Sequence, residues 1–238
     1  MDSLERYLNG EHERVWSEFQ ALGPAVRNEP HLSAARAVGA ETMRRVRRNC
    51  EMLVDRLRAA GYVFGIYPDG SDGYYSEGPL VAPSDATRAA LARLEARVGP
   101  LPLSLVAFWE EVGLVDLVGM RRSWPERLDP LVVGGPAEVL AELDDWEEDQ
   151  GDEDEPEPFE GGLAPDDLHK DNVSGGPPYG VQLPYASADF RFLNERHDLF
   201  FVPYLRLAIL RCGGFPGLDR LPGRMGLLDE LTQGLEPF

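Results

Sequence analysis

A run of acidic residues from Asp144 to Glu160 constrains the fold of this chain more than any other feature. It has 11 aspartates and glutamates in 17 residues, no lysine or arginine, and two prolines. Such a segment cannot bury enough apolar surface to offset the entropy that is lost on ordering. We therefore predict an acidic insertion at 144–160 that is mobile over 149–157 when the protein is alone.

The charge of the whole chain is concentrated around this insertion. The 238 residues carry a formal net charge of −19, and residues 138–171 contribute −15 of it, with 16 acids against the single base Lys170. A polyanion repels nucleic acid and anionic lipid, so we expect direct binding to neither. The charge predicts instead a protein partner with a basic surface.

The sequence indicates neither a membrane span nor a secretory signal. No run approaches 18 apolar residues, and the first residues lack a basic stretch followed by an apolar one. Cys50 and Cys212 have neither CxxC spacing nor neighbouring histidines, so we expect two buried, reduced thiols. These features predict a cytoplasmic protein without a metal or another cofactor.

Apolar periodicity predicts several helices. In the longest, which begins near Pro30 and ends at Gly61, apolar positions recur at spacings of three and four, as in a helix that packs against another element. These positions are Met43, Val46, Cys50, Leu53 and Leu57. The other expected helices span 11–22, 85–98, 102–113, 136–146, 202–212 and 226–232.

Runs of β-branched and aromatic residues predict strands at 62–67, 114–120, 130–133 and 180–185. Helices grouped early, strands in the middle and a late helix predict an α+β fold with a mostly antiparallel sheet packed with helices. We divide the chain into an N-terminal helical region, 1–60, and an α+β domain, 61–238, which carries the acidic insertion. We expect the two to form one compact unit.

The helix pair LARLEARVGPLPLSLVAFWEEVG at 91–113 resembles the opening of the SUKH superfamily. The family's pattern is a helix with a glutamate, a glycine, a Leu-Pro step and a second helix that ends in glycine. Here the matching positions are Glu95, Gly99, Leu101-Pro102 and Gly113. Two later segments, SGGPPY at 174–179 and YLR…GGFPG at 204–217, resemble an uncharacterised bacterial branch of the same group.

This resemblance implies a non-catalytic α+β module. Bacterial members of the family are often proposed to be immunity proteins that neutralise toxins, and a fungal member regulates cell-wall assembly. If the resemblance holds, Leu94, Val98, Leu105 and Phe108 point into the core, and Leu101-Pro102 forms the bend between the two helices.

The acidic run is the first candidate site for a partner. Its acids can mimic nucleic-acid phosphates and enter a basic cleft, or they can serve only to keep a loop solvated. Trp146 lies among them, where it either anchors an interface or packs its helix onto the sheet. The candidate residues are Asp144, Asp145, Trp146, Glu147, Glu148 and Asp149.

A polar loop offers the second candidate site. Asp166, Asp167, His169 and Asp171 lie close in sequence, but their spacing matches no metal or acid–base motif, so we expect structural or surface roles. Lys170, the only lysine in the chain, is interpreted as a partner contact or as an exposed ion pair with a neighbouring aspartate. His169 and Lys170 are therefore the remaining candidates for partner binding.

These observations favour a binding protein of the immunity type, which occludes a basic toxin or effector. The alternative is a scaffold in a bacterial assembly, in which an arginine-bearing helix binds one partner and the acidic insertion another. The arginines of that helix are Arg44, Arg45, Arg47 and Arg48. We do not expect an enzyme, because no nucleophile, phosphate-binding loop or metal motif is present.

Overall fold

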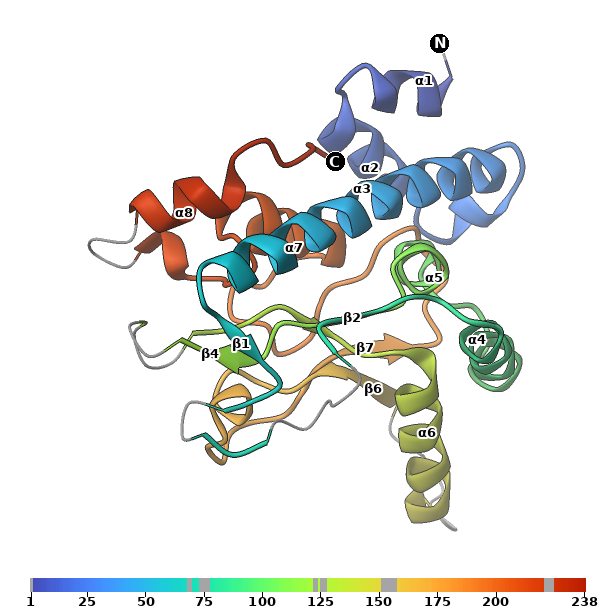
Figure 1. Cartoon of the computed structure of the whole chain (residues 1–238). Coiled ribbons are helices and arrows are strands. Elements are labelled where there is room, and N and C mark those ends of the chain that lie inside the picture. Colours follow the sequence, from blue (N-terminus) through green and yellow to red (C-terminus); the bar gives the residue numbers. More distant parts are fainter. Residues whose placement is uncertain are drawn as a thin grey trace.

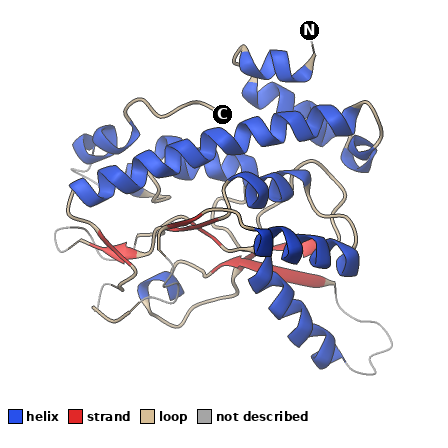
Figure 2. Cartoon of the chain, turned by 45° about the vertical axis from the view of Figure 1, so that its right-hand side comes forward, coloured by secondary structure: helices blue, strands red, loops and turns tan. Residues whose placement is uncertain are grey.

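The computed structural model in Figure 1 describes residues 2–67, 70–72, 78–121, 124, 128–150, 158–220 and 225–238. The fold is mixed α+β, as predicted. Figures 1 and 2 both show the long helix α3 and the N-terminal helices on one side of the strands, with α6 projecting from the opposite end. Within the ranges given above, no helix combines the length and apolar character that crossing a bilayer requires.

The N-terminal part consists of α1 (Ser3–Leu8), α2 (His12–Ala21), a 3-10 turn η1 (Gly23–Arg27) and α3 (His31–Ala59). The five apolar positions of the α3 seam, from Met43 to Leu57, are all fully buried, which confirms the predicted packing face. Helix α1 was not predicted. Asp2 caps its start, because the Asp2 side chain accepts a hydrogen bond from the Glu5 backbone N–H at 2.7 Å.

The helix pair of the resemblance consists of α4 (Asp85–Val98) and α5 (Leu103–Glu111). Ser84 and Thr87 form a reciprocal capping box at the start of α4. Three of the four expected core side chains, Leu94, Leu105 and Phe108, are fully buried, and Val98 is half-buried. The bend lies at Leu101-Pro102 as expected, with Leu101 itself buried.

The strands form three small antiparallel sheets instead of one. In the first, β1 (Val63–Phe64) pairs with β4 (Gly119–Met120), and in the second β3 (Leu114–Asp116) lies between β2 (Leu80–Val81) and β5 (Val132–Val133). In the third, β6 (Phe159–Ala164) pairs with β7 (Tyr179–Leu183).

One expected strand, 114–120, is divided between two of these sheets. The Asp116 side chain accepts a hydrogen bond from the Val118 backbone N–H at 2.8 Å, which turns the chain between β3 and β4. The Leu117 carbonyl accepts a hydrogen bond from the Tyr62 hydroxyl at 2.8 Å instead of extending a ladder. The local side-chain bond therefore interrupts a run whose composition is typical of one continuous strand.

Strand β6 was missed because its sequence contains Gly161-Gly162, which resembles a loop. The glycines are required by α6 (Pro136–Gln150), which packs directly on this strand. A Cβ atom at Gly161 would lie 2.7 Å from a Val139 methyl carbon, and one at Gly162 would lie equally close to the Glu142 carboxylate. A glycine pair in a strand thus marks close approach of a helix.

Helix α6 extends four residues beyond Trp146, the predicted end, so the acidic run begins as a helix. Asp149 and Gln150, the first two residues of the segment predicted to be mobile, belong to α6. The rest of that prediction, at 151–157, falls outside the described residues. Helix formation here is supported by the apolar positions Val139, Leu140 and Leu143, which are buried against the core.

The C-terminal part packs on α3. Helix α7 (Phe201–Leu205) continues as a π-helical turn, η3 (Arg206–Arg211), and is followed by the 3-10 turn η4 (Leu218–Arg220) and α8 (Met225–Thr232). Buried apolar side chains from Tyr7 to Phe238 belong to one continuous cluster, so the N-terminal helices share a core with the strands. Cys50 and Cys212 are free and buried, as predicted, and burial raises the pKa of the Cys50 thiol to about 12.

We predict that Phe108→Ala lowers the free energy of unfolding by about 3–5 kcal/mol, because the ring is fully buried and lies 5.5 Å from Phe201. Urea denaturation measures this loss. Val106→Ala, at a half-buried position of the same helix, is the control and should cost clearly less. Equal losses in the two variants would show that the α4–α5 pair is not the core element described here.

Candidate protein-binding site

The C-terminal end of α6 carries an unusual density of negative charge. All five predicted acids of this region are exposed, and α6 has no base in its last turn. The free carbonyl groups at a helix C-terminus already carry partial negative charge, so acids are unfavourable there. Acids three or four positions apart, such as Asp145 and Asp149, also repel one another. Local stability of the helix does not explain this sequence.

Arg97 of α4 neutralises part of the charge. Its guanidinium lies 2.5 Å from an Asp144 carboxylate oxygen and 2.7 Å from one of Glu147. These two acids therefore hold α6 against α4. Asp145, Glu148 and Asp149 make no ion pair with another described residue, and they remain available to a partner.

Trp146 packs its helix onto the sheet, the second of the two roles considered for it. The side chain is half-buried against the hydrophobic core, and its ring centroid lies 5.7 Å from that of Phe159 on β6. This contact fixes the end of α6 beside the strand. Replacement of Trp146 would therefore disturb the helix itself as well as any partner in contact with it.

A pocket of about 280 Å³ joins α6 to the second candidate region. Glu138 and Glu142 of α6 line it together with His169. The remaining wall consists of β6 residues and of the loop that leads to β7, with Leu163, Ala164, Pro165, Gly176 and Pro178. The structure thus brings His169 close to the acidic helix, although the two lie far apart in sequence.

Both glutamates on the α6 side are exposed. Glu142 accepts a hydrogen bond from the Gly162 backbone N–H at 2.6 Å. Desolvation against β6 raises the pKa of its carboxyl above the ordinary value. Because both carboxylates line the pocket, an arginine or lysine side chain placed in it would meet two opposite charges.

His169 is held in place by Asp166. The imidazole Nδ1 lies 2.7 Å from an Asp166 carboxylate oxygen, which also accepts the His169 backbone N–H at 2.8 Å. Burial by itself would raise the pKa of Asp166. The hydrogen bonds from the backbone N–H groups of His169 and Gly176 outweigh this effect, and the Asp166 pKa lies below its ordinary value. Asp167 pairs with Arg196. The loop that borders the pocket is therefore internally ordered.

Lys170 does not lie where the sequence suggested. We interpreted it as a partner contact or as an exposed pair with Asp166, Asp167 or Asp171, and both interpretations are wrong. Its side chain is fully buried, 2.5 Å from an Asp129 carboxylate oxygen, and its Nζ lies 4.6 Å from the centroid of the Tyr179 ring.

The exposed position expected for Lys170 is wrong because its partner lies in the core. A lysine is rarely buried unless a carboxylate is buried with it, and here that carboxylate is Asp129. Asp129 is 41 positions away in sequence, and no local pattern marks it. The Tyr179 hydroxyl donates to the second Asp129 oxygen at 3.3 Å. The chain's single lysine thus anchors the pocket loop to the core and is not a partner-binding residue.

Larger pockets occur elsewhere, and one of about 620 Å³ lies between α3, α4 and α5. Its Arg27 is already engaged, with hydrogen bonds to the carbonyl groups of Ala186 and Leu101. In the part of the chain that the structure describes, no three histidine, cysteine, aspartate or glutamate side chains are grouped to hold a metal ion. The pocket between α6 and His169 remains the candidate because it joins the helix that carries the acidic run to His169, through Glu138 and Glu142, which the sequence analysis did not select.

No family model matches this chain, and neither does any curated protein or solved structure. The resemblance to the SUKH superfamily therefore rests on the quoted sequence segments alone.

We predict that Lys170→Met lowers the free energy of unfolding by about 3–5 kcal/mol, because it leaves Asp129 buried without a counter-charge. The double variant Lys170→Met/Asp129→Leu should recover most of this loss, since a buried ion pair and an apolar pair of similar volume are often of similar stability. Chemical denaturation of the three proteins tests both expectations. A double variant as unstable as the single one would contradict the role given to this pair.

Proposed function

We propose that this protein is a non-catalytic, SUKH-like binding protein that captures a basic partner protein, and that it acts as an immunity-type inhibitor by occluding a toxin or effector. The observation that carries the proposal is the pocket between Glu138, Glu142 and His169, next to the exposed acids at the end of α6. The resemblance of the helix pair to SUKH proteins supports the inhibitor role.

The pocket suggests how the partner is held. The aliphatic part of an arginine or lysine side chain lies along Pro165 and Pro178, and its charged end lies between Glu138 and Glu142. A buried arginine of this kind is a common energetic centre of protein interfaces. His169, half-exposed at the border, limits the depth to which a side chain enters.

The exposed acids of α6 act at longer range. Asp145, Glu148 and Asp149 attract a basic surface before contact, which accelerates association and makes its rate dependent on salt. The Debye length is about 10 Å at 0.1 M ionic strength and about 3 Å at 1 M, so steering is largely lost at high salt. Steering and anchoring thus belong to different residues and can be measured separately.

The scaffold alternative has weaker support. It requires the arginines of α3 to be available to a partner, but each is paired with a carboxylate of its own chain. Arg44 and Arg45 pair with Glu41, Arg47 pairs with Glu51, and Arg48 pairs with Glu236. A partner at this helix would first have to displace these contacts.

The test begins with affinity capture from the host, followed by binding kinetics with the captured protein. We predict that Glu138→Gln/Glu142→Gln increases the dissociation rate by about tenfold or more, because both carboxylates of the anchor site are lost. Asp229→Asn/Glu230→Gln, on the exposed surface of α8, makes the same change in net charge and serves as the control. It should leave the dissociation rate unchanged.

We further predict that neutralising Asp145, Glu148 and Asp149 slows association and reduces its salt dependence, with little effect on dissociation. Neutralising Asp144 and Glu147, which Arg97 already pairs, should have a smaller effect on association. If the first set changes neither the association rate nor its response to salt, the acids only solvate the surface. Survival of cells that co-express the captured protein then distinguishes an inhibitor from a scaffold.

A further inference from the structure

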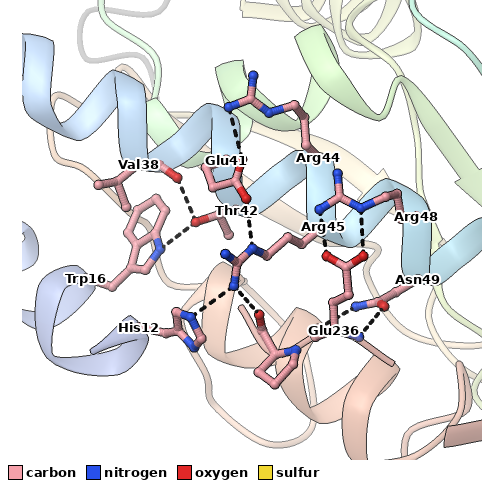
Figure 3. Close-up of polar contacts among 11 residues, drawn as sticks. His12, Trp16, Val38, Glu41, Thr42, Arg44, Arg45, Arg48, Asn49 and Glu236 are labelled. Carbon is pink, nitrogen blue, oxygen red and sulfur yellow. Dashed lines mark hydrogen bonds and ion pairs between the residues drawn. The ribbon is translucent and has the colours of Figure 1, made fainter. Parts of the chain in front are cut away.

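Residues 235–238, of sequence Leu-Glu-Pro-Phe and called here the LEPF segment, lie outside regular secondary structure and against α3. Gly234, with φ of +69°, turns the chain from α8 into this position. Figure 3 shows Arg48 and Asn49 of α3 directed at Glu236, with His12 of α2 beside Arg45. The segment is held by side chains of two different elements, α3 and η3, as the contacts below show.

Asn49 forms hydrogen bonds with the backbone of the segment. Its side-chain oxygen accepts the Glu236 backbone N–H at 2.8 Å, and its side-chain nitrogen donates to the Glu236 carbonyl at 2.9 Å. Asn49 is itself fully buried. The pair of bonds satisfies both main-chain groups of one residue, as a neighbouring β-strand would.

Two arginines extend the main-chain contacts. Arg45 donates to the Pro237 carbonyl at 2.8 Å and is oriented by an ion pair of 2.9 Å with Glu41. Arg206 of η3 donates through Nε to the Phe238 main-chain oxygen at 2.5 Å. Main-chain contacts carry no sequence information, so these three side chains do not by themselves select a particular sequence.

Two side chains of the segment supply specificity. The Glu236 carboxylate accepts hydrogen bonds from both Nε and Nη2 of Arg48, at 2.9 and 2.6 Å. This is the bidentate geometry that arginine and carboxylate favour. The Phe238 ring is only 2% exposed and belongs to the hydrophobic core cluster. Pro237 between them restricts the backbone and lowers the entropy lost on binding. The complement of the groove is thus an acidic residue, a proline and an aromatic residue in that order.

We propose that this groove is a peptide-binding site whose intramolecular ligand is the LEPF segment, and that a partner protein with an acidic–proline–aromatic segment binds there by displacing it. The groove lies at the end of the molecule opposite α6 in Figures 1 and 2, so it is independent of the acidic site. A tethered ligand competes at an effective concentration on the order of millimolar, which keeps the groove closed to weak competitors.

The test uses a fluorescent peptide of residues 233–238, QGLEPF, titrated with full-length proteins and followed by anisotropy. We expect Phe238→Ala, which weakens the intramolecular ligand and leaves the groove intact, to bind the peptide at least about tenfold more tightly than the original chain. Circular dichroism establishes that the variant is folded. Equal affinity of the two proteins, or no binding to either, would overturn the proposal.

A charge exchange provides the specificity control. Arg48 is 44% exposed, so Phe238→Ala/Arg48→Glu should remain folded. It should lose affinity for QGLEPF and regain it for the peptide QGLKPF, in which lysine takes the position of Glu236. Affinity that is indifferent to this exchange would contradict binding in the groove. Light scattering of the original chain completes the test, because a dimer that the peptide dissociates would assign the groove to a second copy instead of a partner protein.

Discussion

The buried ion pair between Lys170 and Asp129 connects the elements that make up the acidic site. Asp129 lies just before β5, and Lys170 lies in the loop that joins β6 to β7. An unpaired charge is costly in the core, so Lys170 and Asp129 must remain paired in the folded protein. This pairing fixes the position of the loop. His169 precedes the buried lysine, is itself exposed, and lines the pocket together with Glu138 and Glu142. The same anchor places Pro165 and Pro178 as walls of the pocket. A site made of loop residues thus obtains a defined shape from one interaction in the core.

The opposite arrangement holds at the surface, where charges are left unpaired. Most arginines of the described chain are engaged with its own carboxylates or carbonyl groups, and Arg45 and Arg48 are examples. The cations therefore hold elements of the fold together. The chain has a net charge of −19, and part of this excess of acids is exposed at the end of α6. Such a distribution lowers local helix stability through the macrodipole and like-charge repulsion. It also creates a directed negative field, which a basic partner can use during approach.

Features that depend on local interactions were predicted from the sequence more accurately than features that depend on contacts between distant residues. Helices were predicted well because their apolar periodicity is local, and the α3 seam and the α4–α5 pair are buried as expected. Strands were predicted less well. Strand β2 has only two residues, and β6 contains glycines that only the packing of Val139 explains. Lys170 was singled out because it is the only lysine. Its buried partner Asp129 was not predicted, because nothing in the local sequence marks it. His169 lies at the surface, and its role in partner binding stays a prediction. Its proximity to Glu142 follows from the tertiary structure alone.

The two proposed binding surfaces require opposite chemistry of a partner. In these proposals the pocket beside α6 binds a cation, and the LEPF groove binds an acid followed by an aromatic residue. A single partner could therefore occupy both only if it presented basic and acidic segments far enough apart to reach opposite ends of the molecule. If it did, binding at one surface would raise the effective concentration at the other, and the intramolecular LEPF segment would be displaced at lower partner concentration. If it did not, the two sites would act independently: a variant of Glu138 would leave binding at the LEPF groove unchanged, and a variant of Arg48 would leave binding at the pocket unchanged.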